Sequence, residues 1–226
     1  MSAFLGPIHH IMFQRIRLVG ERQDELASAV TARMSPGQRE ELERAWSLVH
    51  QPAEGELAEL IGDEPIHAWL QQEMEATLLS EAQLWALAAD RPERRAAVLA
   101  AIREHGRDTG EALRDADPDA VADARRLLQL IDRVLLTSMP CDRVAEVVAA
   151  AEGSFIVRRD LLFHQDLWRR AGLAEDLALA GHEAWLQGLV SAFPGRLVRA
   201  EVQSGGRRLF DDRFLLQPRG EAVHGS

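Results

Sequence analysis

The sequence contains no lysine and no tyrosine, so all 26 of its basic residues are arginines. The lack of lysine excludes a Schiff base on a lysine side chain. The lack of tyrosine excludes a phenolic general acid. Any chemistry must therefore use histidine, aspartate, glutamate, serine, arginine or the single cysteine, Cys141.

With one cysteine, the chain cannot form an internal disulfide framework. It also cannot build a cysteine-rich zinc site or an iron–sulfur cluster. A membrane span needs about eighteen consecutive apolar residues, and no run in this sequence is that long. The N-terminal residues, 1–14, lack the basic start and cleavage site of a signal peptide. These features predict a cytoplasmic protein with no membrane partner.

Acidic residues outnumber basic ones, which gives a formal net charge of −10 at pH 7. Phosphate backbones are bound by concentrated positive surfaces, and here acidic residues are interleaved with the arginines. The charge pattern therefore predicts no nucleic-acid partner. A length of 226 residues suits one domain or two small ones.

Apolar residues recur at helical spacing through most of the first half of the chain. Pro7 is suited to a first helical position, and Ser35-Pro36-Gly37-Gln38 reads as a helix-capping box. Gly106 is expected to end a helix that begins at Pro92. The expected helices cover 7–34, 36–50, a short turn at 57–61, 65–88, 92–106, a short helix within 107–117, and 118–137.

The pattern changes after Pro140. We expect a helix at 144–151, a strand at 155–157, helices at 160–171 and 174–193, and a β-hairpin at 196–216. The hairpin is centred on Gly205-Gly206, a typical turn sequence between two β-favouring runs. The predicted fold class is mainly α and α+β overall. It comprises a helical bundle (1–138), a smaller α+β unit (139–217) and a disordered tail (218–226).

A short repeat links two helix starts, because Pro7-Ile8-His9 and Pro65-Ile66-His67 have the same residues. A true duplication of a helical hairpin and a coincidence both remain open. If the helices pack up, down and up, His9 and His67 lie at one end of the bundle.

Histidines that meet in this way predict a divalent metal site. A helix N-terminus favours neutral imidazole, which is the form that binds metals. His50 and His10 are further candidate ligands, and three histidines with an open position are typical of zinc or non-haem iron. Alternatively, these side chains only hydrogen-bond the backbone near the helix starts. No pair with the usual helical metal-ligand spacing occurs.

A second candidate site contains Cys141, Asp142, Arg143 and His164. Cys141 is expected just before the 144–151 helix, whose dipole would stabilise a thiolate, with His164 as its base. In the alternative interpretation Asp142 is a helix cap, Arg143 is its salt-bridge neighbour, and Cys141 is a small buried apolar residue.

The five tryptophans fall at expected helical positions. Core packing is the preferred interpretation, and the lining of a pocket for a flat ligand is the alternative. They are Trp46, Trp69, Trp85, Trp168 and Trp185.

From about Val144 onward the chain resembles the L-2-amino-thiazoline-4-carboxylic acid hydrolase-like family. The resemblance is carried by residues 157–164, by Trp168 with Gly172-Leu173, and by Gly205-Gly206 with residues 210–214. The family tends to carry cysteine near Leu162 and near Asp211 or Asp212, where this chain has none. The resemblance therefore implies an α+β ligand-binding shape more than a hydrolase reaction. The segment 4–9 resembles the start of uncharacterised bacterial helical proteins.

Three functions follow from the sequence, and whether the protein is an enzyme stays open among them. The first is binding of a metal ion or small molecule at the histidine-bearing end of the bundle. The second is a hydrolase-like enzyme that uses Cys141 and His164. The third is a non-catalytic interaction protein that forms a homodimer through its amphipathic helices.

Overall fold

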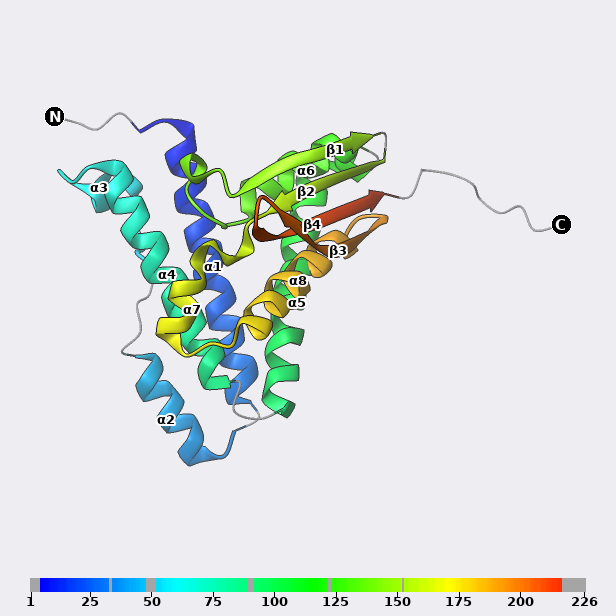
Figure 1. The fold of residues 1–226 in the computed structure, drawn as a ribbon. Coiled ribbons are helices and arrows are strands. Elements are labelled where there is room, and N and C mark those ends of the chain that lie inside the picture. Colours follow the sequence, from blue (N-terminus) through cyan, green and yellow to red (C-terminus); the bar gives the residue numbers. More distant parts are fainter. Residues whose placement is uncertain are drawn as a thin grey trace.

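The structure is a computed structural model that describes residues 5–32, 34–47, 52–88, 92–121, 123–151 and 153–216. Helices form the first part of the chain, and an antiparallel sheet with further helices forms the last part (Figure 1). The fold is mainly α with an α+β unit, as the sequence predicts. The helices are α1 (Pro7–Thr31), α2 (Pro36–Trp46), α3 (Leu57–Ile61), α4 (Ile66–Ala88), α5 (Pro92–Ala116), α6 (Ala124–Val134), α7 (Gln165–Ala171) and α8 (Glu175–Ser191).

Helix α1 begins at Pro7, as the sequence predicts. Gly6 precedes it in an extended conformation, and its carbonyl accepts a hydrogen bond from the backbone N–H of His9 at 3.0 Å. The buried face follows the helical period through Met12, Ile16, Val19, Leu26 and Val30. This face packs against α4 and α5, so α1 lies at the centre of the helical layer.

Helix α5 does not end at Gly106, where the sequence analysis placed its end, but continues to Ala116. The glycine is needed for packing instead. A Cβ atom at Gly106 would lie 2.2 Å from the carbonyl oxygen of Trp185 in α8. A Cβ atom at Gly110 would lie 2.3 Å from the carbonyl oxygen of Leu189 in α8. A Cβ atom at Gly188 of α8 would lie 2.0 Å from the carbonyl oxygen of Arg103 in α5. Glycine at these positions lets the backbones of α5 and α8 touch.

The sheet has four strands in the order β1-β2-β4-β3, and all neighbours are antiparallel. Its strands are β1 (Ala145–Ala151), β2 (Ser154–Arg159), β3 (Gly195–Ser204) and β4 (Arg207–Leu216). The hairpin of β3 and β4 confirms the prediction. Gly205 and Gly206 both have positive φ, as the tightest hairpin turns require.

The expected helix at 144–151 is wrong, because these residues form strand β1. All seven strand residues are exposed, so no buried helical face holds them. Backbone pairing with β2 stabilises them instead, across a turn at Gly153 with φ of 78°. The β-branched Val147 and Val148 suit a strand better than a helix.

Two helices expected in the middle of the chain also differ from expectation. The segment expected as one helix at 118–137 divides into a short 3-10 turn, η1 (Pro118–Val121), and α6. The helix expected at 160–171 begins as another 3-10 turn, η3 (Leu161–His164), and continues as α7. Asp123 caps α6 by accepting hydrogen bonds from the backbone N–H groups of Arg125 and Arg126.

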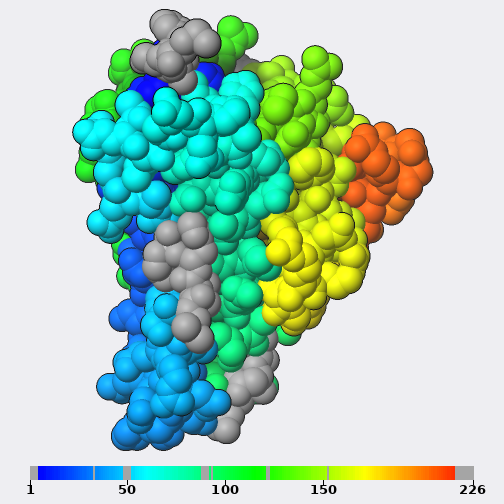
Figure 2. Space-filling model, turned by 90° about the vertical axis from the view of Figure 1, so that its left-hand side faces the viewer, coloured from blue at the N-terminus to red at the C-terminus, as the bar shows by residue number. Residues whose placement is uncertain are grey.

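Among the described residues, the larger of two hydrophobic clusters includes residues from both sides of the 138/139 boundary that the sequence suggests. It contains Trp85 of α4, Ile102 of α5, Trp185 of α8 and the stacked pair Phe155 and Phe214 of the sheet. On one face of the molecule, the chain around α7 lies directly against α4 (Figure 2). The two-domain division itself stays a prediction, and the tail at 218–226 lies outside the described residues.

In the part of the chain that the structure describes, no helix combines the length and apolar character needed to cross a membrane.

We predict that Gly188→Ala strongly destabilises the fold. The new methyl group would collide with the backbone of α5 rather than with a flexible side chain, and overpacking of this kind costs about 1–3 kcal/mol or more. Gly37→Ala is the matched control, because a Cβ atom there meets nothing within 4 Å. Urea denaturation of both variants measures the difference, and equal stability would contradict the backbone contact of α5 and α8.

Candidate functional site

The structure brings His9 and His67 together at one end of the helical layer. His9 lies in the first turn of α1, and His67 lies in the first turn of α4. Their Nε2 atoms are 3.1 Å apart, and their ring centroids are 5.2 Å apart. Two nitrogen ligands of one tetrahedral zinc ion, each bonded at 2.0–2.1 Å, are separated by about 3.3 Å. The pair therefore has the spacing of two ligands of a common metal.

The second nitrogen of His9 shows how its ring is protonated. The backbone N–H of Gly6 donates to Nδ1 of His9 at 3.1 Å, so neutral His9 carries its proton on Nε2. That proton is then donated to Nε2 of His67. Burial lowers the pKa of His9, and His67 and His10 lower it further. Metal binding by both Nε2 atoms requires this proton to leave Nε2 of His9.

Further metal ligands do not join the pair within the described ranges. They contain no group of three or more histidine, cysteine, aspartate or glutamate residues with the spacing of a metal site. His10 follows His9 on α1 and is exposed. His50 lies outside the described residues, so its predicted role stays untested.

In the second predicted site, Cys141 is hydrogen-bonded to Asp142 but not to His164, its predicted base. The Sγ atom of Cys141 is exposed and lies 3.9 Å from the carboxylate of Asp142. His164 donates from Nε2 to the carbonyl oxygen of Thr137 at 2.9 Å, and its pKa is lowered mainly by burial. Asp142 accepts from the backbone N–H of Met139, and Arg143 is exposed with φ of 53°. The helix expected to activate Cys141 is replaced by β1.

A cavity of about 100 Å³ lies between the helical layer and the C-terminal unit, and we call it the interior cavity. Its walls come from α1, α4, α5, η3, α7, α8 and the segment after α6. Most of the wall is apolar and includes three tryptophans, Trp85, Trp168 and Trp185. Polar groups are few, and they are Arg22, Glu81, Thr137, Asp160, His164 and His182. Ligand sites typically combine such a wall with a few placed polar groups.

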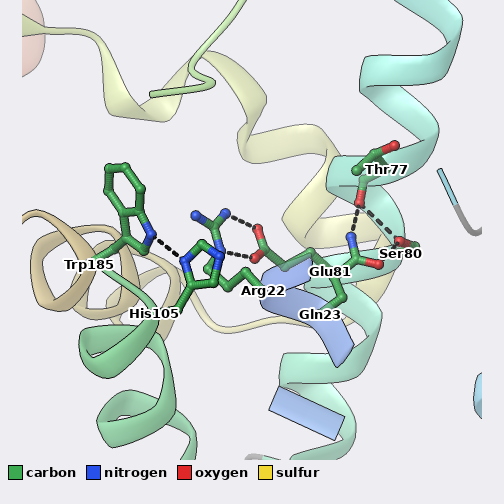
Figure 3. A network of polar contacts seen from close by, with 7 residues as sticks. All are labelled: Arg22, Gln23, Thr77, Ser80, Glu81, His105 and Trp185. Carbon is green, nitrogen blue, oxygen red and sulfur yellow. Dashed lines mark hydrogen bonds and ion pairs between the residues drawn. The ribbon is translucent and has the colours of Figure 1, made fainter. Parts of the chain in front are cut away.

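Arg22 and Glu81 form a two-pronged ion pair in the wall (Figure 3). Nε and Nη2 of Arg22 donate to the two carboxylate oxygens of Glu81 at 2.5 and 2.9 Å. The guanidinium also lies 5.7 Å from the ring centroid of Trp185. Because both side chains are about nine-tenths buried, each charge needs the other to offset its desolvation.

His105 supports the Trp185 side of this wall. The indole Nε1–H of Trp185 donates to Nδ1 of His105 at 2.9 Å, and Figure 3 shows Arg22 between His105 and Glu81. Burial, together with the nearby Arg22 charge, lowers the pKa of His105 to about 4. The ring is therefore neutral at physiological pH, which lets Nδ1 accept the tryptophan hydrogen bond.

A polar contact beside the ion pair joins α1 to α4. Gln23 is fully buried and donates to the carbonyl oxygen of Thr77 at 2.9 Å. The hydroxyl of Ser80 lies 2.9 Å from both Oε1 of Gln23 and the same carbonyl (Figure 3). These bonds satisfy the buried amide and fix α1 against α4 at the level of the cavity.

His182 connects the cavity to a group of buried charges in the sheet. Nη2 of Arg199 lies 2.8 Å from Nδ1 of His182, and Arg199 forms a two-pronged ion pair with Asp212 at 2.7 and 3.0 Å. Arg159 also pairs with Asp212 at 3.3 Å. Burial lowers the pKa of His182 well below its usual value, and the charges of Arg199, Arg159 and Arg22 lower it further.

Known proteins give no further guide. Comparison with protein-family models, curated proteins and solved structures finds no match. The resemblance of the C-terminal part to the thiazoline-carboxylate hydrolase-like family therefore stays a prediction.

Most of this cavity is not visible in the sequence. A tryptophan-lined pocket is one of the alternative predictions, and three of the five tryptophans do line one. No sequence pattern marks Arg22, Glu81, His105 or His182. Gly181 was a usable signal, because a glycine inside a helix often marks a close approach. A Cβ atom there would lie 2.0 Å from the ring of Trp85.

We predict that stability falls as the pH is lowered from about 6.5 toward 4, with a large part of the loss due to His105. The pKa of His105 is lower in the folded protein than in the unfolded chain, so the unfolded chain takes up the proton first. The contribution of His105 to stability is complete above its unfolded pKa and is lost as the pH falls toward its folded pKa. A shift from 6.5 to about 4 corresponds to about 3 kcal/mol.

His105→Asn isolates this contribution, because Asn offers an acceptor near the Nδ1 position and does not titrate. Unfolding free energies of both proteins, measured by urea denaturation at several pH values, should converge as the pH falls. Parallel curves would show that His105 does not resist protonation in the folded protein.

Proposed function

We propose that this protein binds a small, mainly apolar molecule in the interior cavity. The cavity itself supports this proposal. Its volume of about 100 Å³ compares with about 150 Å³ for an engineered apolar cavity that binds benzene. This comparison indicates a ligand close in size to a single six-membered ring.

The position of the cavity supports the same function. It lies where the helical layer meets η3, α7 and α8, and ligand sites commonly form where two structural layers meet. The aromatic rings of Trp85 and Trp185 offer flat apolar surfaces to a ring-shaped ligand. The Arg22–Glu81 pair and the Trp185–His105 bond hold this wall in place, so little ordering is left for the binding step.

Toluene is a suitable first probe, and we expect it to raise the melting temperature. At a free concentration ten times its dissociation constant, binding contributes about 1.4 kcal/mol, which raises the melting temperature by about 3–6 °C for a protein of this size. Ala178→Leu places a larger side chain in the cavity wall and should abolish this increase. Ala180→Leu, on the same helix but outside that wall, should retain it.

A melting temperature that toluene leaves unchanged in the unmodified protein would refute the proposal. An increase that persists in Ala178→Leu would show that toluene binds elsewhere.

A second candidate function is binding of a divalent metal, zinc or iron, by His9 and His67. The 3.1 Å separation of their Nε2 atoms favours it. Both side chains are accessible at the start of their helices, so a metal can be reached from solvent. Two histidines leave further coordination positions for water or for a ligand, as in catalytic zinc sites.

We predict that Zn²⁺ binds the unmodified protein and that His67→Ala abolishes this binding. His10→Ala is the matched control, because His10 is an exposed neighbour outside the pair, and it should leave zinc binding intact. Isothermal titration calorimetry near pH 7.5 measures all three proteins, because metal competes with protons for imidazole. An equal loss in both variants would argue against the His9–His67 pair.

We propose a cytoplasmic location as well, and the homodimer stays an alternative prediction. Light scattering on the purified protein decides between monomer and dimer.

A further inference from the structure

We infer that the ligand of the interior cavity carries an oxygen acceptor, a carbonyl or a carboxylate, that binds to the ring N–H groups of His182 and Trp85. This inference rests on the proposed small-molecule function and specifies the ligand's chemistry. It starts from two buried nitrogens that have no hydrogen-bond partner in the protein.

The protonation of His182 follows from its contact with Arg199. Arginine has only donor groups, so Nδ1 of His182 must be the acceptor of the 2.8 Å bond from Nη2 of Arg199. The proton of the neutral ring is therefore on Nε2. This Nε2–H is buried and has no partner among the described residues.

Arg199 is itself held in place, which fixes this arrangement. Its guanidinium pairs with both oxygens of Asp212, whose side chain is fully buried, and it also donates to the carbonyl oxygen of Leu179. Turning the His182 ring by 180° would place a C–H group, which cannot accept a hydrogen bond, against Nη2 of Arg199. The Nε2–H group of His182 can therefore donate only to a group outside the His182–Arg199–Asp212 network.

Trp85 provides the second donor. Its indole Nε1–H is buried and unpartnered within the described chain, and indole nitrogen can only donate. The far edge of the same ring packs against Gly181, the residue before His182. Trp85 therefore lies against α8 at the residue next to His182, and both residues line the cavity.

The position of these two groups separates them from the other unpartnered nitrogens. Buried nitrogens of Arg15 and Arg159 also have no hydrogen-bond partner, but neither residue lines the cavity.

A buried donor without an acceptor costs about 1–3 kcal/mol. A ligand oxygen that accepts from either donor removes this cost, whereas a purely apolar ligand leaves it in place.

The charges near His182 favour the same kind of ligand. Arg199, Arg159 and Arg22 are close enough to oppose protonation of its ring. A partial or full negative charge on a ligand oxygen beside His182 is attracted by the same guanidinium groups. The neutral state of His182 follows from its burial together with these charges.

Three probes of nearly equal size test this inference in the full-length protein. Toluene has no polar group, benzaldehyde carries one acceptor oxygen, and aniline carries a donor amine. We expect benzaldehyde to bind about tenfold more tightly than toluene, which is the effect of one hydrogen bond of about 1.4 kcal/mol. Aniline should bind no more tightly than toluene. Titration calorimetry gives the three dissociation constants.

Two variants then identify the donors. His182→Asn retains an acceptor for Arg199 and removes the Nε2–H, and Trp85→Phe retains an aromatic ring and removes the indole N–H. Each should reduce the preference for benzaldehyde over toluene severalfold while toluene still binds. Retained toluene binding also shows that each variant is folded.

The outcomes separate this inference from the proposed function. Equal affinities for toluene, benzaldehyde and aniline would overturn the inference and leave the cavity function standing. A preference for benzaldehyde that is unchanged in both variants would overturn it as well. Failure of all three probes to bind would overturn the proposed function, and the inference with it.

Discussion

Three glycines allow the backbones of α5 and α8 to touch, and this contact determines where the C-terminal unit sits. Because Gly106, Gly110 and Gly188 have no Cβ atom, backbone carbonyl oxygens of the facing helix can occupy the space that a side chain would fill. The approach places Trp185 beside His105 and brings α8 against the helical layer. The walls of the interior cavity come from both sides of this junction, so its shape depends on the closeness of the helices.

The buried charges near this junction that the following ion pairs include are each matched by an opposite charge. Arg22 is paired with Glu81, and Arg199 and Arg159 share Asp212. Ion pairs of this kind add little net stability, because their desolvation cost is close to their attraction, but loss of one partner is costly. They also keep nearby histidines neutral, since burial and adjacent guanidinium groups both oppose a further positive charge. Neutral rings can then act as specific donors and acceptors inside the protein.

Much of the fold could be predicted from the sequence because the relevant signals are local. The period of Met12, Ile16 and Val19 marks α1, and Gly205-Gly206 marks the hairpin. Strand β1 was missed because its residues are exposed on both faces and its partner, β2, determines its structure. Gly106 was misread because a packing contact, and not a helix end, requires it there.

The two candidate sites differ in how much of each could be predicted from local sequence signals. The identical Pro-Ile-His segments made His9 and His67 visible, and their positions at helix starts were enough to predict that they meet. The cavity could not be assembled from the sequence, because Arg22 and Glu81 are 59 residues apart and His105 and Trp185 are 80 residues apart. Such contacts depend on how helices cross, which no local pattern specifies.

Strand β1 forms an outer edge of the sheet, and its pairing with β2 shifts register between Val147 and Ala149. An extra residue at this point interrupts the regular row of backbone donors and acceptors and increases the local twist. A flat, regular edge would offer a template for strands of other chains, which is a common route to fibrous aggregates. The irregularity therefore protects the protein from sheet extension at an edge that also exposes the side chains of Val147 and Val148.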